Sequence, residues 1–99
     1  MEDERDVEQY LIRKVKEIGG KSWKWVSPGT AGVPDRICVL PEGNVWFVEV
    51  KRPGGRQSVQ QKLIRKTLLD LGCNSAVVYG KKGVDTWLRY TKAGTFDEF

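Results

Sequence analysis

The sequence predicts a single α/β domain over residues 1–99, in which helices flank a mixed β-sheet in the order αβββαβα. Near the start of the chain, apolar residues recur every three or four positions, which is the period of a helix with one buried face. Further on, two runs of β-branched and aromatic residues enclose a turn sequence, which is typical of a β-hairpin. A helical segment then separates this hairpin from a third such run, as the crossover to a parallel strand requires.

The N-terminal third contains a helix, a short strand and a loop. The helix is expected over residues 3–18 and ends at Gly19-Gly20. Its apolar stripe consists of Val7, Leu11, Val15 and Ile18. A short strand over 23–26 follows, and then a proline- and glycine-containing loop over 27–32.

The remaining elements alternate between strands and helices. The hairpin strands are expected over 36–40 and 45–51, joined by a tight turn at 41–44. A second helix is expected from its N-cap Ser58 to residue 71. A strand over 75–79 and a short helix over 83–90 complete the chain.

The composition excludes several classes of enzyme. The chain has 17 Lys and Arg against 13 Asp and Glu, which gives a net charge of +4, and it has no histidine. It therefore cannot form a Ser-His-Asp or Cys-His nucleophile system, an HExxH zinc site or a Cys₂His₂ finger. Any catalysis must use carboxylates, lysine, hydroxyls or a hard metal ion. The positive charge permits a polyanionic partner.

The sequence predicts neither a membrane protein nor a secreted one. Its apolar runs fall far short of the ~20 residues that span a bilayer, and its charged N-terminus lacks the core of a signal peptide. The two cysteines, Cys38 and Cys73, lack CxxC spacing, so we expect buried free thiols rather than a disulfide framework. We therefore expect a cytoplasmic location and no membrane partner.

Three charged residues near the open end of the hairpin are candidate catalytic residues. Folding at the turn brings Asp35 opposite Glu49 if paired residue numbers sum to 84, whereas a sum of 85 would place it opposite Val50. Glu49 and Lys51 share a face because side chains alternate along a strand. Two facing carboxylates repel unless a cation lies between them, and carboxylate oxygens are preferred ligands of Mg²⁺. A lysine there would hold the attacking water or stabilise charge developing on a phosphate, which outlines a metal-dependent phosphodiesterase.

Each of these assignments has a structural alternative. Glu49 and Lys51 could lie on the solvated face of an edge strand. Glu8 falls inside the apolar arc of the first helix, where a carboxylate is costly without a partner, but it could instead extend its head into water. Gln61 shares the buried stripe of the second helix, where it could orient water or a phosphate oxygen, or simply satisfy a boundary position.

These residues together resemble the VRR-NUC family, the virus-type replication-repair nucleases of the PD-(D/E)xK superfamily. The matching stretches are residues 24–36 with Pro34-Asp35, residues 47–54 with Glu49-Val50-Lys51, and Ser58-Val-Gln-Gln61 with Gly72 eleven residues later. Each is short, but their order and spacing are specific, and the resemblance extends from about Glu8 to Leu88. It implies a restriction-endonuclease-like PD-(D/E)xK core, and the chain is similar to short, stand-alone, phage-derived members.

The resemblance also implies roles for individual residues. Asp35 and Glu49 would be catalytic ligands of Mg²⁺ or Mn²⁺, joined by the backbone carbonyl of Val50 and assisted by Glu8. Lys51 would be the catalytic lysine, and the SxxQ spacing selects Gln61 as the glutamine that follows the core motif. Similar members are dimeric enzymes of branched DNA, so a homodimer is expected.

Basic and polar residues around this site are expected to contact DNA phosphates rather than read bases. The expected contacts are Lys24, Ser27, Arg36, Arg52, Arg56, Lys62, Arg65 and Lys66. The three on the second helix would form a basic ridge, although a solvated helix face is an equal alternative.

The sequence therefore predicts a Mg²⁺- or Mn²⁺-dependent DNA endonuclease that selects branched DNA, such as four-way (Holliday) junctions. The alternative from a different class is a non-catalytic nucleic-acid-binding module that uses the same fold and basic surface.

Overall fold

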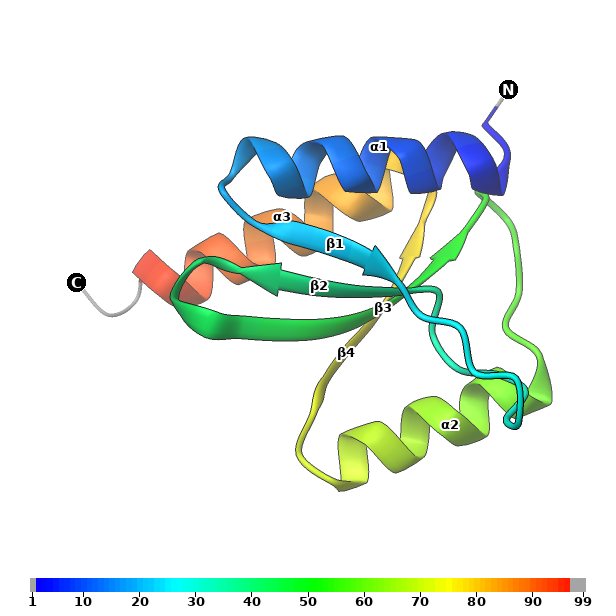
Figure 1. Cartoon of the computed structure of the whole chain (residues 1–99). Helices are drawn as coiled ribbons and strands as arrows, with labels where there is room; N and C mark the ends of the chain where they lie inside the picture. Colours follow the sequence, from blue (N-terminus) through cyan, green and yellow to red (C-terminus); the bar gives the residue numbers. More distant parts are fainter. Residues whose placement is uncertain (1, 97–99) are drawn as a thin grey trace.

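The computed structural model describes residues 2–96, and the side chains of residues 2–91. Its elements are α1 (Glu4–Glu17), β1 (Lys21–Lys24), β2 (Arg36–Leu40), the 3₁₀ turn η1 (Pro41–Gly43), β3 (Asn44–Lys51), α2 (Val59–Asp70), β4 (Asn74–Tyr79) and α3 (Gly80–Phe96). The strands form one mixed sheet in the order β1-β2-β3-β4, in which only the β3–β4 pair is parallel. Helices α1 and α3 cover one face of this sheet, and α2 lies against the other (Figure 1). The predicted fold class and element order are confirmed.

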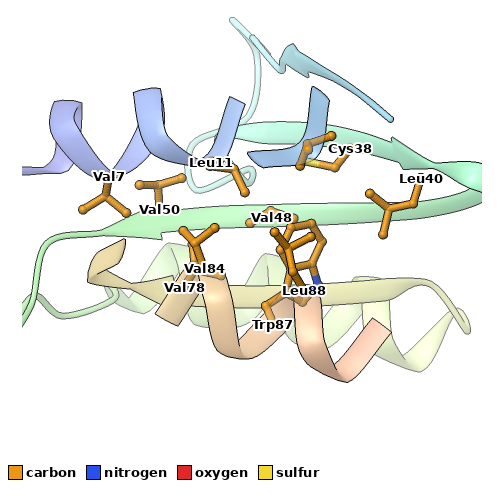
Figure 2. Close-up of a cluster of buried hydrophobic side chains, with 11 residues drawn as sticks. Val7, Leu11, Cys38, Leu40, Val48, Val50, Val78, Val84, Trp87 and Leu88 are labelled. Atoms are coloured by element: carbon orange, nitrogen blue, oxygen red, sulfur yellow. The ribbon is translucent and has the colours of Figure 1, made fainter. Parts of the chain in front are cut away.

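The core lies between the sheet and the α1–α3 pair. Val48 and Val50 of β3 point into it and meet Val7 and Leu11 of α1 and Val84 of α3 (Figure 2). Alternate residues of β3 face this core because side chains alternate along a strand. The residues between them, Glu49 and Lys51 among them, therefore face the side of the sheet that carries α2.

Two elements differ from the sequence prediction by more than one residue. The first strand is residues 21–24 rather than 23–26, because it starts directly after the Gly19-Gly20 turn and pairs in register with β2, Lys21 opposite Val39. The last helix is residues 80–96 rather than 83–90. Gly80, at φ +71°, allows the chain to turn from β4 directly into this helix. The helix therefore starts before the residues whose apolar pattern predicted it.

Helix α2 and the loop before β2 are held together at one end of the sheet. The Ser58 side chain accepts from the backbone N–H of Gln61, and the Gln61 side chain accepts from the backbone N–H of Ser58, which forms a capping box. Gly32 of the preceding loop, at φ +89°, approaches α2 so closely that an added Cβ would lie 2.6 Å from the backbone carbon of Gln60. The loop that leads to Asp35 is therefore fixed against the start of α2.

Other predictions about the chain can be compared with the structure directly. Both cysteines are free thiols; Cys38 is buried, as expected, whereas Cys73 is half-buried rather than buried. In the part of the chain that the structure describes, no helix is long and apolar enough to cross a membrane.

Candidate active site

The strand register brings Asp35 and Glu49 to the same end of the sheet. Arg36 pairs with Val48 in the antiparallel β2–β3 ladder, so paired numbers sum to 84. This is the register on which the predicted site depends. It places Asp35 opposite Glu49, one position beyond the last pair of the ladder.

Glu49 and Lys51 are buried on an internal strand, which excludes the alternative of a solvated edge. Glu49 is 1% exposed and Lys51 8% exposed, and β3 lies between β2 and β4. The Lys51 Nζ lies 3.9 Å from Glu49 Oε2, which has no hydrogen-bond partner among the described residues. A buried carboxylate oxygen without a donor is costly, so this oxygen is available to a cation or to a bound molecule.

The Asp35 carboxylate is fixed by the backbone of β3. Its Oδ2 accepts a 2.7 Å hydrogen bond from the N–H of Val50. In an extended strand the N–H and the C=O of one residue point to the same side, so the Val50 carbonyl is directed toward Asp35 as well. Asp35 and the Val50 carbonyl thus lie on the same side of β3, as the predicted ligand set requires.

Burial raises the pKa of both carboxyl groups. For Asp35, burial is the main cause, the Val50 hydrogen bond opposes it, and the charges of Glu8 and Glu4 raise the pKa further. For Glu49, burial again dominates; the hydrogen bond from Gln57 and the Lys51 charge oppose it, while the Asp35 charge raises the pKa. Burial therefore disfavours the charged form of both carboxyl groups, which is the form that binds a cation.

These pKa shifts predict that the metal-free protein loses stability as the pH rises. The folded state binds protons more tightly than the unfolded state, whose Asp and Glu titrate near 3.8 and 4.5. The stabilisation is therefore present at low pH and is lost as the pH rises through the folded pKa values. Thermal unfolding measured upward from about pH 4 should show this slope, and the slope should be smaller in Asp35→Asn. Equal slopes in the two proteins would contradict the prediction.

Glu8 is held by Arg36 at the edge of this site. Arg36 Nη1 donates to Glu8 Oε2 at 3.1 Å, and the Glu8 side chain is 26% exposed. Among the described residues, no three Asp, Glu or Cys side chains form a ready-made metal cluster. Glu8 is thus neither an unpartnered core carboxylate nor a free solvent-facing one. The charge of Glu8 raises the pKa of Asp35, but the Glu8 carboxylate is already paired with the Arg36 guanidinium.

A glutamine that no sequence pattern indicated contacts one of the acidic residues. Gln61 is half-buried, and its side-chain oxygen is used in the capping box with Ser58. Gln57 Nε2, in contrast, donates a long 3.4 Å hydrogen bond to Glu49 Oε1. The sequence carries no periodic signal for Gln57, because it lies in the loop that returns from β3 to α2.

The predicted DNA contacts separate into exposed and engaged side chains. The exposed ones are Lys24, Arg52, Arg56, Lys62 and Lys66. Ser27 is half-buried. Two arginines are turned inward: Arg36 is 9% exposed and fully engaged, and the half-buried Arg65 donates from Nη2 to the Ser75 carbonyl at 3.3 Å. Arg65 is therefore not part of the predicted basic ridge, because it faces the sheet rather than solvent.

Comparison with known proteins identifies the family of this chain. The model of the VRR-NUC domain matches residues 3–82. The chain is 44% identical over 69 residues to "Putative nuclease p44" of Acyrthosiphon pisum secondary endosymbiont phage 1, a match that covers 70% of this chain and 74% of that protein. The chain belongs to the VRR-NUC family. A solved structure of a VRR_NUC domain superposes with a TM-score of 0.80 at 28% identity, covering 87% of this chain and 94% of that one.

Membership of this nuclease family agrees with the chemistry of the site. VRR-NUC is a nuclease domain, and the match includes each of the predicted site residues. The buried Oε2 of Glu49, which has no hydrogen-bond partner among the described residues, is the feature that fits a divalent cation, because carboxylate and carbonyl oxygens are its preferred ligands. Asp35, Glu49 and the Val50 carbonyl are the groups that could hold one.

Proposed function

We propose that this VRR-NUC chain is a Mg²⁺- or Mn²⁺-dependent DNA endonuclease that selects branched DNA, such as four-way junctions. The observation that carries the proposal is the buried Glu49 oxygen without a donor, which lies beside Asp35 and 3.9 Å from the Lys51 ammonium. Buried polar groups are usually hydrogen-bonded, so a buried carboxylate oxygen without a donor favours a site that binds a cation.

The residues have distinct roles in the proposed reaction. Asp35, Glu49 and the Val50 carbonyl would hold the cation, with Glu8 assisting from α1. The cation would neutralise charge on the phosphate and lower the pKa of the attacking water. Lys51 would orient the attacking water or stabilise the charge that develops on the phosphate, and its burial strengthens both effects. Gln61 could orient the nucleophile through its amide nitrogen, since only its oxygen is used in the capping box.

The exposed cations support a polyanionic substrate. Lys24 lies at the end of β1, Arg52 and Arg56 lie in the loop after β3, and Lys62 and Lys66 lie on α2. Side chains of this kind bind the phosphate backbone without reading bases, so shape rather than sequence would select the DNA. We place the protein in the cytoplasm of a bacterial host, because the phage protein p44 is similar to it.

Cleavage assays test this proposal. The protein should cut four-way junctions faster than flaps, and flaps faster than plain duplex, with Mg²⁺ or Mn²⁺ but not with EDTA. Matched RNA duplexes should remain intact. DNA binding without metal-dependent cleavage would instead support the non-catalytic binding module.

We also propose that the protein is a homodimer formed along β4. This strand lies at one edge of the described sheet, and a groove of about 670 Å³ runs beside it, lined among others by Trp46, Arg65, Trp87 and Tyr90. A second copy is the occupant we favour, because two copies of one edge strand can pair antiparallel around a two-fold axis.

Sedimentation of two matched variants tests the dimer. Tyr90 is 67% exposed beside the groove, so Tyr90→Lys should place like charges across the two-fold axis and yield monomers. Trp23 is 53% exposed on β1, at the opposite edge of the sheet, so Trp23→Lys should remain dimeric. A monomeric wild type, or a dimer that dissociates only in Trp23→Lys, would contradict the proposal.

A further inference from the structure

The Arg36 guanidinium is engaged at all three of its nitrogens on the face of the sheet that α1 covers. Its Nε donates to Ser22 Oγ at 3.0 Å, its Nη2 donates to the Ser22 carbonyl at 3.2 Å, and its Nη1 donates to Glu8 Oε2 at 3.1 Å. Because the side chain is buried and each nitrogen has a partner, Arg36 is not placed to contact DNA phosphate.

Ser22 makes this arrangement rigid. It is 8% exposed on β1 and lies opposite Cys38 in the β1–β2 register. Both its hydroxyl and its carbonyl oxygen accept from the same guanidinium, so the planar group has one orientation. That orientation directs the remaining nitrogen, Nη1, at α1.

The Glu8 carboxylate that Nη1 holds lies at the same end of the sheet as Asp35, because Arg36 directly follows Asp35 in the chain. Its charge raises the pKa of Asp35, which directly precedes Arg36 in the chain. Arg36 takes one oxygen of Glu8, Oε2, and among the described residues no hydrogen bond or ion pair uses the other. Without Arg36, no positive charge would offset the repulsion between the half-buried Glu8 carboxylate and Asp35. The Glu8 side chain would then be free to change its rotamer.

We propose that Arg36, anchored on Ser22, is a positioning residue that holds Glu8 beside Asp35 and so determines how tightly the site binds a divalent cation. This inference rests on the proposed metal-dependent function. Residues that orient the ligands of a metal typically contribute 10–100-fold to its affinity. The direction in which the cation affinity changes when Arg36 is replaced separates this role from a purely electrostatic one. If Arg36 acted only as a nearby positive charge, its removal would tighten cation binding.

Calorimetric titration of the metal-free protein with Mn²⁺ tests the inference without reference to cleavage. Arg36→Met should weaken Mn²⁺ binding by about tenfold or more. In the Glu8→Gln background, Arg36→Met should cause no further weakening, because the two residues act through one contact. Arg13→Met is the matched control, since it removes the same charge from an exposed α1 side chain that pairs with Glu17 and lies over the Tyr10 ring, and it should leave the affinity unchanged.

Each result separates this inference from the proposed function. If wild-type protein binds Mn²⁺ and Arg36→Met binds it equally or more tightly, the positioning role is wrong and the metal site stands. The positioning role is also wrong if Arg36→Met weakens Mn²⁺ binding equally in the wild-type and the Glu8→Gln backgrounds. If wild-type protein binds no Mn²⁺, the proposed function fails. If Arg36→Met shows no cooperative melting, Ser22→Ala replaces it; loss of the Oγ contact should weaken Mn²⁺ binding severalfold, and unchanged binding would overturn the inference.

Discussion

Replacing Lys51 with alanine is expected to lower the rate of DNA cleavage by about 10²–10³-fold, the usual cost of removing one preorganised charge-stabilising group. Lys51 is 8% exposed at the end of β3, and its ammonium lies 3.9 Å from the Oε2 of Glu49. A neutral solvent molecule cannot supply the positive charge of the ammonium that orients the nucleophile. Single-turnover cleavage of a four-way junction with Mg²⁺ measures this effect.

The affinity for the cation distinguishes a catalytic lysine from a structural one. Because Lys51→Ala removes a positive charge next to Glu49, Mn²⁺ should bind as tightly as to wild type, or more tightly, while cleavage is lost. Lys62→Ala is the matched control, since it removes an exposed lysine from α2 and should weaken DNA binding without lowering the single-turnover rate. Cleavage that survives Lys51→Ala would contradict the proposed mechanism.

Two substitutions of Asp35 are expected to abolish cleavage equally but to differ in stability. Asp35→Asn and Asp35→Ala both remove a carboxylate that would hold the cation. Changing a residue that only supports a metal ligand already lowers metal affinity or activity 10–100-fold, so removing a ligand itself should lower the cleavage rate by at least about 10²-fold. The asparagine retains an oxygen that can accept from the Val50 N–H, whereas alanine leaves this buried donor unpaired. Asp35→Ala should therefore be less stable than Asp35→Asn by about 1–3 kcal/mol.

Chemical denaturation and Mn²⁺ titration of both variants measure these effects. Neither variant should be stabilised by Mn²⁺, whereas wild-type protein should melt at a higher temperature as the cation is added. Stabilisation of Asp35→Asn by Mn²⁺ would show that the cation binds elsewhere. Equal stability of the two variants would show that the Val50 hydrogen bond contributes little to the fold.

The order of the elements was predictable because the signals for each are local. The apolar stripe of α1, the capping residue Ser58 of α2 and the β-rich runs on either side of η1 all lie within the segments that they specify. The boundaries of β1 and α3 were not predictable in this way. Pairing with β2 determines where β1 begins, and the left-handed conformation of Gly80 determines where α3 begins.

The acidic site was predictable for a similar reason. The turn limits the hairpin register to two choices, and the alternation along β3 puts Glu49 and Lys51 on one face. The structure selects the register that brings Asp35 opposite Glu49. Gln57, which contacts Glu49, was missed because irregular loops carry no periodicity that predicts the direction of a side chain.

The sequence by itself determined the fold class and the family, and it indicated Asp35, Glu49 and Lys51 as candidate site residues, because these depend on local pattern and on order along the chain. Only the tertiary structure decided which charged side chains are free to act. It buries Arg36 against Ser22 and Glu8, and it turns Arg65 toward the sheet. These contacts join residues 10 to 28 positions apart, and their formation depends on how strands and helices pack. Burial of a charge is a property of that packing, so no local pattern in the sequence specifies it.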